Sequence, residues 1–574
     1  ATPNPVEITN HSSVGAIYLS NDLPPTTASD SISAKAVALQ KSGAIVSDTG
    51  PTGLTPGDTV EYTLNGQVSD YFTVGNLVVT DTLGDGQTYL NSFTPTVTLQ
   101  SNGTTVATTN FQPGEFTVAG KDANGQTLIT FNLSAAIARL IPGSNGQLVG
   151  DNSGGFGQGP TTFTIQLQST IDNAYSGVVS GTKTLTAGDT IANSSEIKFS
   201  VPGGGGQITE GTSSSLTVAT PSLVKAKYAL NGSTPPPNPF LVAAGNTVTY
   251  RLTTTLPVSS VENFTLTDYL PIPLFSVPAT PNFTNGGLCG GGAAPTSPAM
   301  NSWCYTAADT ISSTAPTVST DTSLNRIVWA YGNRELPSAG GVIDILYTLQ
   351  ATAEPMADQL NLANLAIQSF HDSLSSTEQT AAVTQQVTTQ EPQLVIKKGI
   401  TAVSHGTIVS TPTTGYDAEA QGLDAGDTVT YRVSIINIGS APAYGIRVTD
   451  TAGTLTPSPF SNCTAPTTTL GNGSPVATSG SLFTTAGLTI TPPLAGNGDG
   501  TVQTSEEIWI SYTCTLATNA TPRTSDIDNT AVLQYYTNIN PSSPSLGLTP
   551  SNFATNTQLL TRQPKLTTQG IQSI

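Results

Sequence analysis

Stretches that alternate polar and apolar residues recur along the chain, and each predicts a β-strand with one buried face. Thr428-Val-Thr-Tyr-Arg-Val-Ser-Ile435 alternates in this way, and Gly445-Ile-Arg-Val-Thr-Asp450 does so again. The pair Gly426-Asp427 precedes the first stretch and predicts a turn, because Gly tolerates a positive φ and Asp can bond nearby backbone. The pattern therefore predicts a turn followed by two half-buried strands.

The same phrase of turn and two strands occurs three times, and the distance from its glycine to its closing aspartate is nearly constant. Such self-similarity at a long period indicates a repeated domain. The copies are Gly57-Asp-Thr-Val-Glu-Tyr62 with Val79-Thr-Asp81, Gly245-Asn-Thr-Val-Thr-Tyr250 with Leu266-Thr-Asp268, and Gly426-Asp-Thr-Val-Thr-Tyr431 with Val448-Thr-Asp450.

Further matching segments divide the chain into repeats. The second and third repeats open alike at Pro221 and Pro392, and Pro564-Lys-Leu-Thr567 begins in the same way near the end of the sequence. We therefore expect an N-terminal arm with short strands (1–34), three β-sandwich repeats (35–220, 221–391 and 392–560), and a C-terminal strand that resembles the start of a further repeat (561–574).

Composition agrees with an all-β protein. Charged residues make up only 10% of the 574 residues, and the abundant Thr, Ser, Gly, Asn and Pro favour strands and turns over helices. The best helix candidate is Met356–Ser369. A net charge of −19 argues against binding to nucleic acid, and no apolar run is long enough to span a membrane. The opening Ala1-Thr-Pro3 is typical of a chain after signal cleavage, so we expect a secreted protein.

The repeated phrases resemble a family of extracellular conserved repeats known as "domain of unknown function eleven". Its pattern has an opening strand that ends in Lys, then G-D-T-V-x-Y, a V-T-D-T-L phrase and a closing N-T-A-x-V strand. Here Val79-Thr-Asp-Thr-Leu83 and Asn529-Thr-Ala-Val-Leu533 match it, and the resemblance covers about residues 35 to 560. It implies tandem immunoglobulin-like Greek-key β-sandwiches, with loop insertions because these copies are long, in bacterial or archaeal surface proteins without enzymatic activity.

The four cysteines fall in two pairs, and each pair lies inside one repeat. We expect the disulfides Cys289–Cys304 and Cys463–Cys514, which would indicate an oxidising compartment, with four free thiols as the alternative. Zinc is not expected, because the chain has no C-x-x-C and its three histidines are scattered.

A lysine, an aspartate and an asparagine occupy matched positions in all three repeats. Alignment on the motifs places the Lys on the first strand, the Asn on the last strand and the Asp between them. A buried Lys loses its proton to desolvation and becomes a nucleophile, while a buried protonated Asp polarises the Asn carbonyl, so that ammonia leaves and an isopeptide bond forms. This resembles the collagen-adhesin domains of pili. The alternative is a surface Lys, a turn Asn and a capping Asp. The candidates are Lys41, Asp81 and Asn193; Lys227, Asp268 and Asn364; and Lys398, Asp450 and Asn529.

One segment resembles part of a calcium-binding loop. Asn497, Asp499 and Glu506 fit three ligand positions, but Ala495 stands where the first carboxylate belongs. A Gly-rich hairpin is the alternative, and no cofactor is expected. No catalytic constellation is evident, so we expect no enzymatic activity.

These observations predict a non-enzymatic extracellular structural protein that polymerises with itself into a surface fibre or layer. Subunits would join head to tail when a strand of one adds to a sheet edge of the next. The candidate contact residues are Pro564, Leu566, Ile571 and Ile574 in the C-terminal strand and Val6 and Ile8 in the arm. The alternative is a surface adhesin that binds a ligand through domain-tip loops, for which Trp303, Tyr305 and the Cys289–Cys304 loop are the aromatic candidates.

Overall fold

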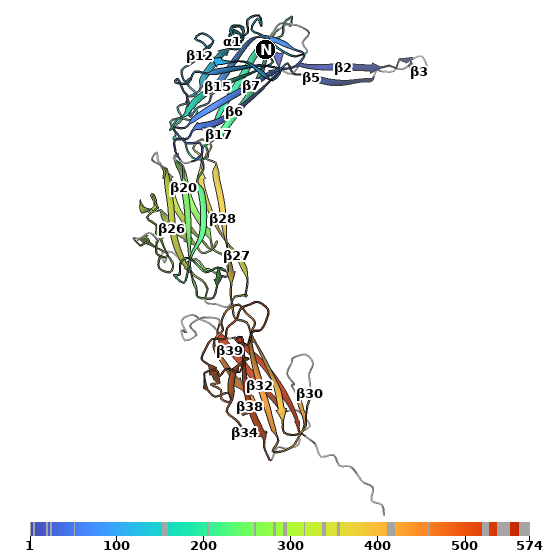
Figure 1. The fold of residues 1–574 in the computed structure, drawn as a ribbon, viewed down its shortest axis with the longest axis vertical. Coiled ribbons are helices and arrows are strands. Elements are labelled where there is room, and N and C mark those ends of the chain that lie inside the picture. Colours follow the sequence, from blue (N-terminus) through green and yellow to red (C-terminus); the bar gives the residue numbers. More distant parts are fainter. Residues whose placement is uncertain are drawn as a thin grey trace, which may run out of the picture.

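The chain folds into three β-sandwiches that follow one another along the long axis of the molecule (Figure 1). This computed structural model shows an all-β protein of tandem immunoglobulin-like Greek-key sandwiches with loop insertions. The structure describes residues 2–561 except 4–5, 16, 19–20, 23–25, 51, 152–158, 204–205, 258–259, 279–282, 291–294, 315, 336–339, 353–355, 410–418, 454, 456–457, 519–526 and 537–550.

The first sandwich packs a sheet built around β8 against a sheet built around β7. One short helix, α1 (Leu133–Leu140), also packs into its core. The first sheet has the order β1 (Thr2–Pro3), β17 (Gln207–Thr217), β16 (Thr190–Ser200), β8 (Thr73–Leu83), β13 (Thr127–Asn132), β12 (Phe116–Val118), with β14 (Leu148–Val149) also on β8. The second has the order β11 (Thr104–Asn110), β10 (Thr96–Ser101), β15 (Thr162–Ile171), β7 (Thr59–Val68), β6 (Val37–Ser47), with β9 (Gln87–Tyr89) also on β15.

The second sandwich repeats this arrangement. Its first sheet has the order β18 (Ser222–Leu230), β20 (Thr247–Leu256), β26 (Gly341–Gln350), β23 (Ser302–Tyr305), β22 (Thr284–Leu288), and its second has the order β19 (Leu241–Val242), β28 (Glu378–Thr389), β27 (Asn361–His371), β21 (Val261–Tyr269), β25 (Arg326–Arg334), β24 (Thr317–Asp321). The helix candidate Met356–Ser369 is therefore wrong, since most of that segment lies in β27. The sheet provides hydrogen-bond partners on both sides of this strand, which outweighs its weak helical pattern.

The third sandwich has the same two-layer construction. One sheet has the order β29 (Leu394–Val403), β32 (Thr428–Asn437), β38 (Glu507–Leu516), β34 (Phe460–Cys463), with β35 (Thr467–Leu470) also on β38. The other has the order β30 (Thr407–Val409), β31 (Glu419–Leu423), β40 (Ser551–Thr561), β39 (Ile527–Tyr536), β33 (Tyr444–Asp450), β37 (Leu488–Ile490), β36 (Thr478–Gly480).

The repeated phrase forms the predicted turn and strand in each sandwich. Gly57, Gly245 and Gly426 have φ of 96°, 76° and 89°, a region that favours glycine. The residue after each glycine accepts, through its side chain, a hydrogen bond from the backbone N–H three residues before it. Asp58, for example, accepts from Thr55 at 2.7 Å. The tyrosine that closes the phrase is almost wholly buried in all three copies. The phrase therefore fixes both the start of a central strand and a residue of the core.

The N-terminal segment forms a two-stranded antiparallel hairpin that projects sideways from the first sandwich (Figure 1). Its strands are β2 (Val6–Val14) and β5 (Thr26–Ala34), and the register places Val6 opposite Ala34 and Ile8 opposite Ile32. The other predicted contact residues, Pro564, Leu566, Ile571 and Ile574, lie outside the described residues.

Two carboxylates, the buried Asp189 and the half-buried Asp358, connect neighbouring sandwiches. Asp189 of the first accepts hydrogen bonds from the backbone N–H and the hydroxyl of Ser373 in the second, at 3.0 and 2.9 Å. Asp358 of the second accepts the backbone N–H of Ser440 in the third at 3.0 Å. Gln359 also donates to the carbonyl of Gly498 at 2.7 Å. These hydrogen bonds connect the first sandwich to the second and the second to the third.

Candidate functional site

A lysine and an aspartate form a buried ion pair between the two sheets of each sandwich. The side chains of all six residues are at most 1% exposed. In the third sandwich the lysine nitrogen lies 2.8 Å from the carboxylate. The pairs are Lys41–Asp81, Lys225–Asp268 and Lys398–Asp450.

The strand register explains why these pairs meet. Each lysine comes from the first strand of one sheet (β6, β18 or β29), opposite the residue two positions after the tyrosine of the repeated phrase. Its ammonium group therefore lies over that tyrosine ring, 5.2 Å from the centroid of Tyr62, 5.0 Å from Tyr250 and 5.3 Å from Tyr431. Each aspartate comes from the opposite sheet (β8, β21 or β33), so the pair bridges the two layers.

The asparagine of each repeat lies at one fixed position relative to the aspartate. Asp81 is directly opposite Ser195, and Asn193 is two residues before that partner. Asn364 and Asn529 have the same relation to the partners of Asp268 and Asp450. Such diagonal neighbours share a face of the sheet, with Cα atoms about 7–8 Å apart. All three asparagines are fully buried at 0% exposure. We call these sets site 1 (Lys41, Asp81, Asn193), site 2 (Lys225, Asp268, Asn364) and site 3 (Lys398, Asp450, Asn529).

The structure corrects the predicted lysine of the second repeat. Lys225 forms the buried pair, whereas Lys227 donates to the carbonyl of Gln386 at 3.0 Å and lies over the ring of Phe240. Lys227 is opposite the tyrosine of the repeated phrase itself, and the strand pairing becomes irregular just after it. The loops between the lysine strand and the phrase differ in length, so alignment along the sequence does not fix the register.

A second correction concerns the asparagine strand, which is not the last of its sandwich. Strands β16, β27 and β39 carry the asparagines, and each pairs with one further strand, β17, β28 or β40. A bond from Lys to Asn would therefore connect the first strand to the penultimate strand. Because these strands belong to different sheets, the bond would join the two layers.

Burial changes the chemistry of the lysines. Desolvation lowers the pKa of Lys41 and Lys225, and it lowers the pKa of Lys398 to about 8, although the neighbouring carboxylate opposes the shift in each case. A larger fraction of neutral, nucleophilic amine results. Among the described residues, neither side-chain polar atom of Asn193 has a hydrogen-bond partner. A buried amide without partners is costly, which makes its conversion by a neighbouring amine favourable.

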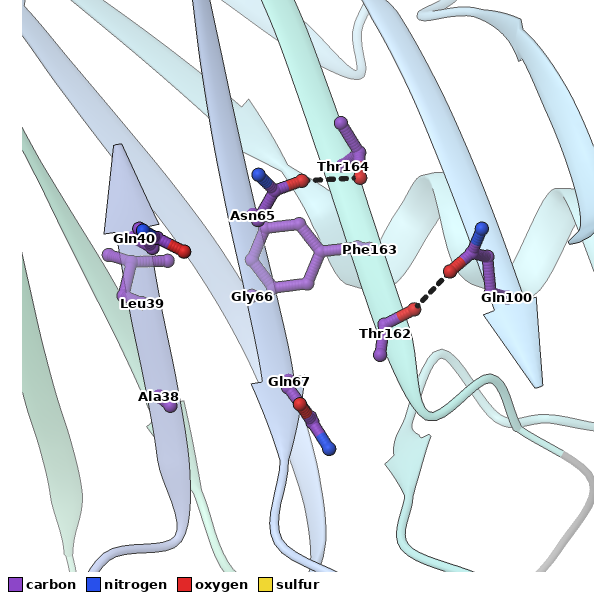
Figure 2. A pocket seen from close by; sticks show the side chains of 10 residues that line it. All are labelled: Ala38, Leu39, Gln40, Asn65, Gly66, Gln67, Gln100, Thr162, Phe163 and Thr164. Carbon is purple, nitrogen blue, oxygen red and sulfur yellow. Dashed lines mark hydrogen bonds between the residues drawn. The ribbon is translucent and has the colours of Figure 1, made fainter. Parts of the chain in front are cut away.

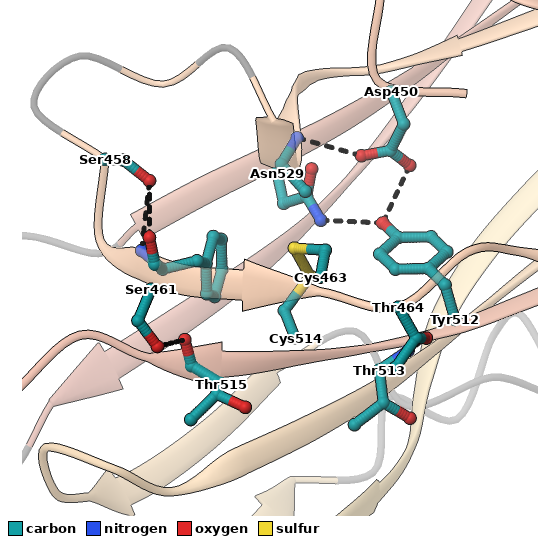
Figure 3. The surroundings of a disulfide bond; sticks show 12 residues. Asp450, Ser458, Ser461, Cys463, Thr464, Tyr512, Thr513, Cys514, Thr515 and Asn529 are labelled. Carbon is teal, nitrogen blue, oxygen red and sulfur yellow. Dashed lines mark hydrogen bonds between the residues drawn. A yellow bond between two sulfur atoms is a disulfide. The ribbon is translucent and has the colours of Figure 1, made fainter. Parts of the chain in front are cut away.

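Both predicted disulfides are present. Cys289 is bonded to Cys304 in the second sandwich, and Cys463 is bonded to Cys514 in the third. Figure 3 shows the second of these bonds close to site 3, where Tyr512 lies between Asp450 and Asn529. No described cysteine is free.

Two other predicted sites receive no support. The carboxylate of Asp499 accepts hydrogen bonds from Thr501 in its own turn, and that of Glu506 accepts the backbone N–H of Gln503. Local turn hydrogen bonds therefore account for these two calcium candidates, and Asn497 donates to Asp499. In the predicted aromatic tip, Trp303 is only 1% exposed and belongs to the second core, and Tyr305 is half-buried against the same core. Its strand β23 pairs with β26, which turns the indole inward.

A polar hollow of about 260 Å³ lies on the first sandwich, over strands β6, β7 and β15 (Figure 2). Thr164 donates to Asn65 at 2.7 Å and Thr162 donates to Gln100 at 3.3 Å, so its polar side chains largely bind one another. Gly66 is required at its floor, since a Cβ there would lie 2.1 Å from the ring of Phe163. The hollow includes no residue of the three sites.

Comparisons with known proteins locate solved structures with low similarity. The major pilin subunit BcpA of Bacillus cereus shares 10% identity over 66% of this chain and 74% of its own, with a TM-score of 0.21. A C-terminal fragment of the major pilin of Streptococcus agalactiae shares 14% over 60% and 91%, with a TM-score of 0.21. The collagen-binding subdomain of the Enterococcus faecalis surface protein ACE shares 16% over 31% and 95%, with a TM-score of 0.18. No family model and no curated protein matches the sequence.

No helix among the described residues is long and apolar enough to cross a membrane. The only α-helix there, α1, has eight residues.

Proposed function

We propose that this protein is an extracellular structural protein whose three sandwiches are each closed by an isopeptide bond. The bonds would join Lys41 to Asn193, Lys225 to Asn364 and Lys398 to Asn529. The observation that carries the proposal is the recurrence of one buried geometry in three sandwiches. One buried ion pair could serve the structure alone. The same pair lies beside a buried asparagine in every sandwich, which supports one cross-linking reaction common to all three.

The reaction balances within each site. The neutral amine of Lys attacks the side-chain carbonyl carbon of Asn, the new C–N bond forms, and the bond to the amide nitrogen breaks. The aspartate accepts the proton that the lysine loses and returns it to the departing nitrogen, so ammonia leaves. No cofactor or oxidant is required. The product also removes a buried charge pair whose desolvation is costly.

The proposed bonds suit a protein that bears tension. Each bond would connect the first strand to the penultimate strand across the two sheets, so a pulling force would pass through covalent bonds instead of through the core. The disulfides support an extracellular location, because such bonds persist in oxidising compartments. The resemblance to extracellular conserved repeats and the low proportion of charged residues agree with this assignment. An adhesin stays the alternative, although Trp303, one of its aromatic candidates, is buried in the second core.

Intact-protein mass spectrometry tests the bonds. Each bond removes one ammonia, so the mass should be lower than the sequence predicts by three ammonia molecules, in addition to the hydrogens lost in two disulfides. Peptide mapping should then recover three branched peptides, including one that contains Lys225 and Asn364. A mass that the disulfides explain completely would exclude the bonds.

We further propose that subunits assemble into a fibre or layer with the β2–β5 hairpin as a contact element. An isolated two-stranded hairpin is marginally stable in water, and its open edges are able to pair with another strand. The donated strand of residues 564–574 stays a prediction. Deletion of residues 6–34 should abolish polymers seen by negative-stain electron microscopy while the three sandwiches remain folded. Normal polymers from the deleted protein would contradict the role of the hairpin.

A further inference from the structure

Each buried aspartate accepts a hydrogen bond from a hydroxyl group as well as contacting its lysine. At site 3 the hydroxyl of Tyr512 donates to Asp450 at 2.8 Å, and at site 2 Tyr347 donates to Asp268. At site 1 the donor is Ser195, which is 2.6 Å from Asp81. All three hydroxyls are buried, so each is shielded from water.

The donor comes from a different strand in the first sandwich. Tyr347 and Tyr512 lie directly opposite the tyrosine of the repeated phrase, on the sheet that carries the lysine. Leu167 occupies this position in the first sandwich and has no hydroxyl. The residue directly opposite the aspartate shows the reverse distribution of hydroxyl groups. It is Ser195 at site 1, but Ala366 and Ala531, which have no hydroxyl, at sites 2 and 3.

We propose that this hydroxyl is a positioning group for isopeptide formation, supplied by Ser195 from the neighbouring strand at site 1 and by Tyr347 or Tyr512 from the facing sheet at sites 2 and 3. The inference rests on the proposed cross-link. The first sandwich combines Leu167 with Ser195, whereas the third combines Tyr512 with Ala531. Each sandwich therefore supplies one hydroxyl to its aspartate, from one or the other of two positions.

The hydroxyl also connects the carboxylate to a reacting side chain. Tyr512 accepts the amide N–H of Asn529 at 2.9 Å, so its oxygen lies between Asp450 and the nitrogen that leaves as ammonia. Ser195 instead accepts from the amine of Lys41 at 2.7 Å, so its oxygen lies between Asp81 and the nucleophile. In both sites one carboxylate oxygen is held by this donor, which fixes the orientation in which the aspartate exchanges protons.

The test moves the hydroxyl instead of only removing it. Ser195→Ala should slow formation of the Lys41–Asn193 peptide by about 10- to 100-fold, because misplaced reacting groups cost that much. Adding Leu167→Tyr to this variant should restore the rate. Tyr512→Phe should slow the bond of site 3 in the same way, and adding Ala531→Ser should restore it. The rate is the rise of each branched peptide with time after isolation, measured by mass spectrometry.

Ser169→Ala is the matched control, because Ser169 is also buried in the first sandwich but donates to Gln87. It should leave the rate at site 1 unchanged. Sites 2 and 3 of the same molecules serve as internal references. A purely structural role predicts no rescue by a hydroxyl placed on another strand.

The outcomes separate this inference from the cross-link itself. Wild-type rates in both Ser195→Ala and Tyr512→Phe would overturn the positioning role while leaving the bonds established. Failure of both relocated hydroxyls to restore linkage in folded variants would also overturn it. Absence of every branched peptide from the wild-type protein would overturn both proposals.

Discussion

The first and third sandwiches build the same buried site from different neighbours. In the third, Tyr512 reaches Asp450 from the facing sheet and its ring adds a second aromatic surface beside Lys398. In the first, Leu167 replaces that tyrosine, and Ser195 reaches Asp81 from the adjacent strand. The charged pair and the buried asparagine are the same in both. We infer that the proposed cross-link requires these three residues, while the hydroxyl that donates to the carboxylate comes from either of two positions.

Removal of the carboxylate should have the largest effect in both sandwiches. Asp81→Ala and Asp450→Ala should each abolish the isopeptide bond of their own sandwich. Each change also leaves a buried lysine without its carboxylate, which should lower the free energy of unfolding by about 3–5 kcal/mol. Peptide mapping and chemical denaturation measure the two effects.

Asp70→Ala is the control for this change, because Asp70 is exposed in the first sandwich. It should alter neither the bond nor the stability. If either site still formed its bond at the normal rate without its aspartate, the carboxylate would not be required at that site.

The second sandwich extends the comparison, since it offers two lysines on one strand. Lys225→Met should eliminate the branched peptide of site 2, because the buried Lys225 amine is the proposed nucleophile. Lys227→Met should leave that peptide unchanged, because the Lys227 amine is bound to a backbone carbonyl. Mass spectrometry of the two variants distinguishes them. The reverse result would overturn the assignment of Lys225 to site 2.

Reduction of the disulfides should destabilise the second and third sandwiches but not the first. The first sandwich has no cysteine, so reductant should leave its unfolding unchanged. The second and third should each lose about 2–4 kcal/mol of stability. The loss should be greater in the third, where the bonded cysteines are 51 residues apart instead of 15. Calorimetry with and without reductant measures this, and equal losses in all three would contradict it.

The smallest expected effect is a dependence of the cross-linking rate on pH. The pKa of Lys398 is lowered to about 8, so its neutral form increases as pH rises to that value and changes little above it. Below about pH 8 the rate at site 3 should fall about tenfold for each unit of pH, because protonated amine is not nucleophilic. Protein isolated at acidic pH and shifted to higher pH allows the measurement. A rate that is flat from acidic to alkaline pH would rule out the amine as the titrating group.

Much of the fold follows from local sequence patterns. The alternation in Thr428–Ile435 and the Gly-Asp turn specify a half-buried strand and its start, because side-chain direction has a period of two and only glycine adopts the turn readily. The pairing of Cys463 with Cys514 followed from their presence in one repeat. The threefold recurrence of Lys, Asp and Asn also identified most of the candidate site.

Only the tertiary structure decided which groups meet. The choice of Lys225 over Lys227 depends on the register between β18 and β20, which the connecting loop does not encode. Ser195 was not recognised, because a serine in a Ser-rich strand has no local signal and gains its role only opposite Asp81. Trp303 resembled an exposed tip residue until pairing of β23 with β26 placed it in the core. Alternation determines which face of a strand is buried, but the packing of two sheets determines what that face contacts.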